Sequence, residues 1–195
     1  MKKTKIELSD YPTEEQLSKE LARERYKHRY GAAFRSTVYI LVIVAAVAVL
    51  VATLWMPVLQ IYGNSMNPTL KEGDIVMTVN RPDLDRGDVV GFYYNNKLLV
   101  KRIIGEPGDW ISIDDSGNVF VNDEELDEPY VSEKAMGDCD IVFPYQVPDE
   151  RYFVMGDHRS VSLDSRNTAV GCISKDQIAG KLTFRVWPLN SVNRL

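Results

Sequence analysis

The chain has 195 residues, of which 45% are hydrophobic and 26% charged, and its net charge is −5. This balance is typical of globular proteins and excludes a chain that is disordered as a whole. Residues 1–37 carry a net charge of +3 and the remainder −8; this argues against nucleic acid as a partner, because phosphate contacts need clustered Lys and Arg.

The amino-terminal segment, residues 1–37, is rich in charge and is predicted to be partly helical. Thr13, followed three residues later by Gln16, is typical of a capping box, which would open a charged helix that runs to about Tyr30. Nothing in this segment indicates a chemical role.

The next segment, Val38 to Met56, has 19 residues without a charge, long enough for a transmembrane helix, and Pro57 is expected to end it. A cleaved secretory signal is disfavoured, because its apolar region is shorter and lies closer to the amino terminus. A buried soluble helix is disfavoured because the segment is apolar on every side.

The charges on either side of this span predict its direction. Lys71 is the one basic residue in the segment just after it, whereas five lie between residues 23 and 35 just before it, and cytoplasmic flanks carry the excess of Lys and Arg. The amino terminus is therefore expected in the cytoplasm and residues 57–195 outside the cell membrane, with the chain crossing once. The five preceding basic residues are Arg23, Arg25, Lys27, Arg29 and Arg35.

After the span the sequence changes to short apolar runs, several of them preceded by Gly with Asp or Asn. Such turn residues before β-branched and aromatic stretches predict a mainly β protein: the single transmembrane helix, then an all-β extracytoplasmic domain with meander connections. A small subdomain, about residues 114–145, is expected as an insertion, and one short turn at residues 174–179. The expected strands are IVMTV (75–79), VVGFYY (89–94), LLVKRII (98–104), WISI (110–113), VFV (119–121), YFVM (152–155) and KLTFRVW (181–187).

The two cysteines, Cys139 and Cys172, are too few for a disulfide framework and lack the spacing of a zinc site. Two alternatives stay open: one disulfide in an exported domain, or two small buried side chains.

Ser65 lies in the segment GNSMNPTL, residues 63–70, where Gly, Asn and Pro predict a tight turn that presents a hydroxyl and nearby amide groups. Amides in such a turn suit an oxyanion intermediate, although a plain turn is the commoner role of such a serine. A reactive serine needs a base. Because His28 falls on the cytoplasmic side, the candidates are His158 and a lysine.

A lysine can act as a base only in its neutral form, and the predicted position of Lys101 favours that form. On the predicted strand it shares one face with Leu99 and Ile103, and an apolar surrounding disfavours the charged form of lysine. The alternative is an edge-strand lysine that prevents aggregation. A third polar cluster, GDHRSVSLDSR at residues 156–166, predicts a hydrogen-bonded loop or, taken alone, a solvated turn.

Together the three segments resemble the signature boxes of bacterial type I signal peptidases. Residues 63–69 match the serine box G-x-S-M-x-P-T, and residues 101–109 match the lysine box K-R-(I/V)-(I/V)-G with its following P-G-D. Residues 156–166 match the last box, G-D-N-R-x-x-S-x-D-S-R. The resemblance covers roughly residues 38–190, in which the order of the boxes and the preceding anchor also agree.

This resemblance implies a role for each matched residue. Ser65 would be the nucleophile and Lys101 the general base that later returns the proton. Ser162 would orient the lysine by a hydrogen bond, while Asp164 and Arg166 would form a supporting ion pair.

Three further residues of the boxes are implied as support. Met66 and Pro68 would help to place the nucleophile, and Arg102 would support the lysine box from the neighbouring position. The backbone N–H of Ser65 would contribute to the oxyanion hole.

The chain departs from the family pattern at four positions of these boxes, and at two of them Ser160 and Val161 replace more polar residues. Gly63 stands where some members carry a serine that supplies a second oxyanion donor, and His158 stands where the family usually has Asn. Relatives in the endoplasmic reticulum carry His at the lysine position, so Lys101 places the chain on the bacterial side.

The expected function is endoproteolytic removal of signal peptides from secretory preproteins at the outer face of the cytoplasmic membrane, through a Ser–Lys dyad and an acyl-enzyme. The expected partners are preproteins, with small residues at positions −1 and −3, and the lipid bilayer; no metal or organic cofactor is implied. Three alternatives remain: a Ser–Lys peptidase dedicated to a few envelope proteins, a Ser–His protease using His158, and a membrane-tethered binding domain without turnover.

Overall fold

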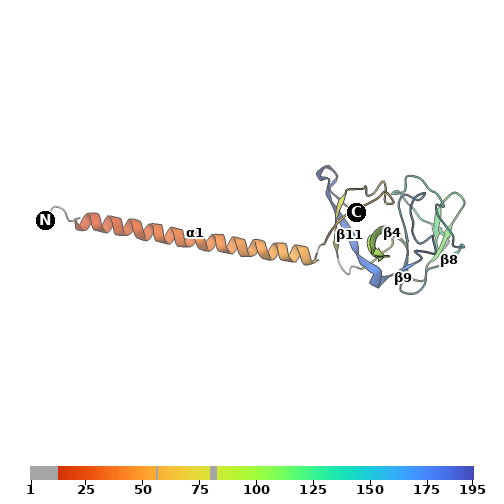
Figure 1. Ribbon diagram of the computed structural model, residues 1–195, viewed down its shortest axis with the longest axis horizontal. Helices are drawn as coiled ribbons and strands as arrows, with labels where there is room; N and C mark the ends of the chain where they lie inside the picture. Colours follow the sequence, from red (N-terminus) through yellow and green to blue (C-terminus); the bar gives the residue numbers. More distant parts are fainter. Residues whose placement is uncertain (1–12, 56, 80–82) are drawn as a thin grey trace. The chain divides into compact units, whose positions relative to one another are not determined.

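The computed structural model describes residues 13–55, 57–79 and 83–195. It divides into two compact units, with the boundary between Val51 and Ala52. The first is helical and the second is built almost entirely of strands (Figure 1).

Helix α1 (Glu14–Trp55) begins at the predicted capping box. The Thr13 N–H donates to Gln16 Oε1 at 3.0 Å, and the Gln16 N–H donates to Thr13 Oγ1 at 3.4 Å. The expected end near Tyr30 is wrong, since the helix continues without a break. The one weak position, Gly31, costs only about 1 kcal/mol relative to Ala and is flanked by good helix formers.

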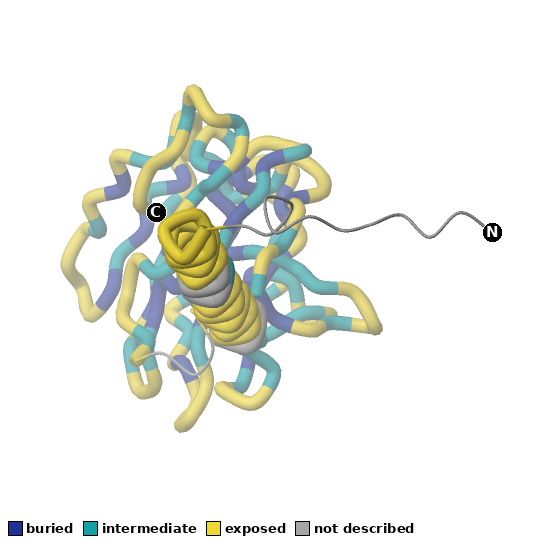
Figure 2. The backbone as a smooth tube through the Cα atoms, turned by 90° about the vertical axis from the view of Figure 1, so that its left-hand side faces the viewer, coloured by how far each residue is buried: buried dark blue, intermediate teal, exposed yellow. Residues whose placement is uncertain are grey.

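Within α1, an 18-residue segment, Phe34–Val51, is long and apolar enough to cross a membrane. Figure 2 shows α1 exposed along nearly all of its described length, whereas buried residues gather in the β unit. The last residue of the predicted span, Met56, and residues 1–12 of the predicted cytoplasmic segment lie outside the described residues.

The main antiparallel sheet has the strand order β1-β2-β11-β3-β4-β9-β10, and β12 pairs with β11. The predicted meander is wrong at one place, because β11 from the far end of the chain lies between β2 and β3. The predicted turn after β10 is the 3-10 helix η2 (Lys175–Gln177), and η3 (Leu189–Ser191) is a second one. The strands are β1 (Val58–Gln60), β2 (Ile75–Val79), β3 (Val89–Tyr94), β4 (Lys97–Gly105), β9 (Arg151–Met155), β10 (Ile173–Ser174), β11 (Ile178–Trp187) and β12 (Asn193–Arg194).

A second sheet, in the order β7-β6-β5-β8, is inserted between β4 and β9. Its strands are β5 (Trp110–Ile113), β6 (Val119–Val121), β7 (Glu124–Glu125) and β8 (Tyr145–Gln146). The insertion therefore begins earlier than the predicted residue 114. The predicted class, a mainly β protein with one amino-terminal apolar helix, is confirmed.

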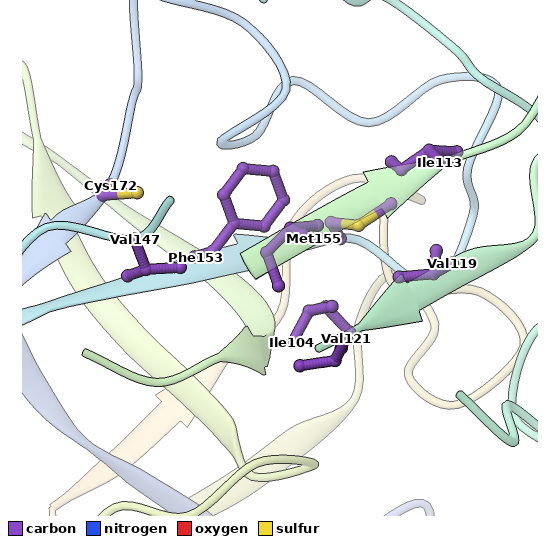
Figure 3. Close-up of a cluster of buried hydrophobic side chains, with 9 residues drawn as sticks. Ile104, Ile113, Val119, Val121, Val147, Phe153, Met155 and Cys172 are labelled. Carbon is purple, nitrogen blue, oxygen red and sulfur yellow. The ribbon is translucent and has the colours of Figure 1, made fainter. Parts of the chain in front are cut away.

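The two sheets share a hydrophobic core. In Figure 3, Ile104 of β4 and Met155 of β9 lie among Ile113, Val119 and Val121 of the second sheet. The insertion is thus packed onto the strand that carries the lysine box.

Both cysteines are free, which excludes a disulfide between them in this structure. Cys172 is buried in the shared core, and its thiol pKa is raised to about 11, mainly by burial.

A buried ion pair joins the insertion to the loop after β9. The Arg159 guanidinium donates to both carboxylate oxygens of Glu128, and both side chains are fully inaccessible to solvent. The Tyr130 hydroxyl also donates to Glu128, at 3.1 Å. An unpaired buried charge destabilises the folded state far more than a buried ion pair does. Loss of either partner would therefore destabilise the fold through the charge that remains.

Replacing Glu128 by Ala should lower the free energy of unfolding by about 3–5 kcal/mol, because Arg159 would stay buried without its partner. The measurement is denaturant unfolding of the full-length protein in detergent, followed by near-UV circular dichroism. Glu125→Ala is the matched control: Glu125 pairs with Lys134 at the exposed surface, and its loss should cost less than about 1 kcal/mol. Equal effects of the two substitutions would contradict this account.

Candidate active site

Ser65 lies on the turn between β1 and β2. Met66 and Leu70 anchor the turn in the core, with 2% and 0% of their surface exposed, while Gly63 and Asn64 face solvent. The backbone at Gly63 has a positive φ of 82°, which glycine adopts without strain. This alternation of buried and exposed residues leaves the Ser65 side chain half-buried at the edge of the core.

Lys101 meets Ser65 directly, although 36 residues separate them in sequence. Its Nζ donates to Ser65 Oγ at 2.8 Å and to the Val100 carbonyl at 3.0 Å. The pairing of β4 explains this position: β3 covers one edge of residues 97–102, but β9 begins to pair only at Arg102. One edge of the strand is therefore open beside Lys101.

The Lys101 amine is almost completely removed from solvent, with 3% of the residue exposed. Burial lowers its pKa from 10.5 to about 8, because the charged form loses its hydration. The carboxylates of Asp164 and Asp157 oppose this by favouring the ammonium, and Arg166 lowers the pKa further. The amine can therefore lose its proton near neutral pH.

Asp164 and Arg166 form the predicted ion pair, and both are completely buried. Arg166 Nε and Nη2 each donate to one carboxylate oxygen of Asp164 at 2.8 Å. The Gly156 N–H also donates to Asp164, at 2.9 Å, and Arg166 Nη1 donates to the Met136 carbonyl at 2.6 Å. The pair thus fixes the last box and ties it to the insertion.

Arg102 connects the lysine box to the other two boxes. Its guanidinium donates twice to Asp157, at 2.9 and 2.7 Å, and the Thr69 hydroxyl donates to the same carboxylate at 2.5 Å. The guanidinium carbon also lies 3.9 Å from the ring centre of Tyr130 in the insertion. Asp157 of the last box is the common acceptor for the other two boxes, a role that sequence reasoning missed.

Ser162 does not form the hydrogen bond to Lys101 that the family resemblance implied. Its hydroxyl is buried and has no hydrogen-bond partner among the described residues, while Lys101 Nζ donates to Ser65 and Val100. Ser162 nevertheless packs beside the nucleophile turn. A Cβ on Gly156 would collide with the Ser162 hydroxyl and lie 2.5 Å from the Ser65 carbonyl oxygen, so only glycine fits there.

His158 contacts the turn that carries Ser65 without contacting the Ser65 hydroxyl. Its backbone N–H donates to the Ser65 carbonyl at 3.0 Å, and its ring Nδ1 lies 3.3 Å from the Asn64 carbonyl oxygen. These contacts hold the turn in place and offer no direct path for a proton from Ser65 Oγ to the imidazole.

A groove of about 680 Å³ leads to Ser65 and Lys101. One wall is β1 with the residues after it, and the other is the first half of β4. Among the described residues, strand β1 pairs only with β2, so each wall presents a strand edge without a partner in the main sheet. The lining residues are Val58, Leu59, Gln60, Ile61, Tyr62, Gly63, Ser65, Met66, Lys97, Leu98, Leu99, Val100 and Lys101.

Comparison with known proteins identifies the family. The family described as "Signal peptidase, peptidase S26" matches residues 34–187, which include the apolar helix segment, the groove and all three boxes. The chain belongs to the signal peptidase S26 family. It is therefore a serine endopeptidase.

Individual relatives agree with this assignment. The chain is 36% identical to signal peptidase I of Bacillus amyloliquefaciens over 165 residues, which is 79% of this chain and 88% of that protein. It is 37% identical to signal peptidase I S of Bacillus subtilis over 79% of this chain and 89% of that protein. It is 39% identical to signal peptidase IB of Staphylococcus aureus over 67% of this chain and 77% of that protein.

Replacing Lys101 by Met should raise the free energy of unfolding at pH 7 by up to about 3 kcal/mol, because the native state no longer buries an ammonium. In the wild-type protein, the free-energy cost of burying the Lys101 ammonium is fully present below pH 8, where the amine is protonated in both the folded and the unfolded chain. It shrinks between about pH 8 and 10.5, since there only the unfolded chain stays protonated.

The measurement is denaturant unfolding of both full-length proteins in detergent at several pH values. The gap in stability should close as the pH rises from 8 toward 10.5. Lys97→Met, at the exposed start of the same strand, is the control and should show no such closing gap. A gap for Lys101→Met that is the same at every pH would mean that the amine is not dehydrated.

Proposed function

We propose that the chain removes signal peptides from secretory preproteins, with Ser65 as nucleophile and Lys101 as general base. The observation that carries the proposal is the 2.8 Å contact between Lys101 Nζ and Ser65 Oγ, made by an amine whose pKa is lowered to about 8. Membership of the signal peptidase family supplies the reaction class.

In the first half of the reaction, neutral Lys101 accepts the Ser65 hydroxyl proton as Oγ attacks the scissile carbonyl carbon. The oxygen of the tetrahedral intermediate becomes negative, and the Ser65 backbone N–H is the proposed donor to it. When the intermediate collapses, the C–N bond breaks and the Lys101 ammonium gives its proton to the leaving amine. This leaves the signal peptide as an ester on Ser65.

In the second half, water attacks the ester carbon while Lys101 accepts a proton from the water. The C–O bond to Ser65 breaks, and Lys101 returns the proton to the serine oxygen. A base of pKa about 8 suits both halves, since it can accept and donate at similar cost near neutral pH. Asp164 and Asp157 contribute by keeping the Lys101 pKa from falling further.

The groove supports binding of an extended peptide. A substrate strand could pair with the open edge of β1 or of β4, and alternate side chains would then point to the groove floor. The walls are largely aliphatic, in keeping with the small apolar residues at positions −1 and −3 that the family resemblance implies.

We propose further that α1 anchors the chain in the cell membrane, with residues 1–37 in the cytoplasm, 38–56 as the span and 57–195 outside. The support is the apolar segment Phe34–Val51 and the excess of basic residues before it. The lipid bilayer and preproteins are the proposed partners.

Ser65→Ala and Lys101→Ala should each abolish cleavage of a purified preprotein, lowering kcat/KM by at least about 1000-fold. Loss of the nucleophile prevents formation of the ester, and loss of the amine removes the base that contacts Ser65. Cleavage is followed by mass spectrometry of the products. Ser160→Ala and His158→Ala are the controls; a collapse of activity only in His158→Ala would instead favour a Ser–His protease.

The pH dependence should follow the Lys101 amine. Since only its neutral form accepts a proton, kcat/KM should rise about tenfold per pH unit below pH 8 and level off above it. The measurement is single-turnover cleavage of a peptide without titratable side chains, with His158→Ala run beside the wild type. A profile that levels off near pH 6.5 and changes in His158→Ala would contradict the role of Lys101.

A further inference from the structure

A second pocket, of about 530 Å³, adjoins the turn that carries Ser65. It has no lining residue in common with the groove: Ser65 and Met66 line the groove, whereas Asn64 and Asn67 line the pocket. The turn therefore separates the two spaces, and the insertion and the last box complete the second one. The lining residues of this pocket are Asn64, Asn67, Pro68, Lys71, Glu72, Ser132 and His158.

The chemistry of the pocket is opposite to that of the groove. All its lining residues except Pro68 are polar or charged, whereas the groove walls are largely aliphatic. Lys71 and Glu72 are exposed, and among the described residues neither the Lys71 amine nor the Glu72 carboxylate forms a hydrogen bond or an ion pair. The pocket thus offers charges of both signs to a polar ligand.

The groove ends at the catalytic pair. Its walls run from Val58 and Lys97 at one end to Ser65 and Lys101 at the other, and β9 pairs with β4 from Arg102 onward. The groove can therefore hold only one side of the scissile bond. Under the proposed function this is the signal-peptide side, with positions −1 and −3, so the first residues of the mature protein must continue past Ser65.

We propose that the second pocket binds the side chain at position +2 of the preprotein, the second residue of the mature protein, which rests on the proposed function. Positions −1 and +2 are two residues apart, so in an extended chain their side chains point to the same face about 7 Å apart. The pocket begins at this distance from Ser65, because Asn64 precedes Ser65 directly and the Asn67 N–H donates to the Asn64 carbonyl at 3.1 Å.

The charges in the pocket define which side chains it accepts. Lys71 attracts an acidic side chain at +2, and Glu72 attracts a basic one. A large aliphatic side chain would remove water from these polar groups without replacing the lost hydrogen bonds, which is unfavourable. The pocket therefore selects polar residues at +2, in contrast to the apolar residues that the groove accepts.

The test uses preproteins that differ only at +2, carrying Glu, Lys or Leu, with Ala at −3, −1 and +1. For the wild type, Lys71→Gln and Glu72→Gln in the full-length protein, kcat/KM is measured with each substrate. The ratio of kcat/KM for Glu to that for Lys should fall about threefold in Lys71→Gln and rise about threefold in Glu72→Gln, since each substitution removes one of two opposing charges. The wild type should cleave the Leu substrate more slowly than either.

Lys175→Gln and Asp176→Asn are the controls, because they remove the same charges from residues that line neither the groove nor the second pocket. They should leave the Glu-to-Lys ratio unchanged, and thermal unfolding shows whether each variant is folded. The assignment of the pocket is overturned by an unchanged ratio in both pocket variants, by equal shifts in the controls, or by opposite shifts when Glu and Lys stand at +1 instead. Absence of cleavage by the wild type would overturn the proposed function instead, so the two failures are distinguishable.

Discussion

The whole catalytic region is organised around one costly group, the dehydrated amine of Lys101. Water would restore the ordinary pKa of this amine, so the groups around it must be dry and must also remain electrically balanced. The carboxylates nearest to it, Asp157 and Asp164, are each held by an arginine. Two guanidinium–carboxylate pairs thus surround the amine, and the site tolerates them because each buried charge has a partner with good geometry.

This requirement explains why a second sheet accompanies a small peptidase domain. The insertion contributes aliphatic side chains to the shared core, which hold it against β4 and β9. It also contributes polar partners to the catalytic boxes: Glu128 to Arg159, and the Met136 carbonyl to Arg166. The insertion therefore provides partners for the buried arginines of the last box.

The sequence predicted the local features well. Period-two apolar runs between Gly-containing turns located most strands, because strand and turn preferences are properties of short segments. Ser65 and Lys101 could be predicted for the same reason, since each lies in a short box with a recognisable pattern. The helix end was missed because a single glycine is too weak a signal.

The features that escaped prediction depend on contacts between distant segments. Strand β11 lies between β2 and β3 because it pairs with segments about 100 residues earlier in the chain, and no local sequence pattern predicts such pairing. The ion pair of Glu128 was not predicted, because its partner Arg159 lies 31 residues away in the sequence. The hydrogen bond predicted between Ser162 and Lys101 is also absent among the described residues. A motif indicates which residues lie near one another, but it does not determine which of several nearby acceptors receives the lysine hydrogen bonds.

The order of these segments along the chain has a consequence for biosynthesis. The turn that carries Ser65 is held by two contacts: the Thr69 hydroxyl donates to Asp157, and the His158 backbone N–H donates to the Ser65 carbonyl oxygen. Arg166 completes the second guanidinium–carboxylate pair only after four fifths of the polypeptide has been made. A nascent chain that already contains both Ser65 and Lys101 therefore lacks the supports that align them, and the protease comes into being only near the completion of its own synthesis.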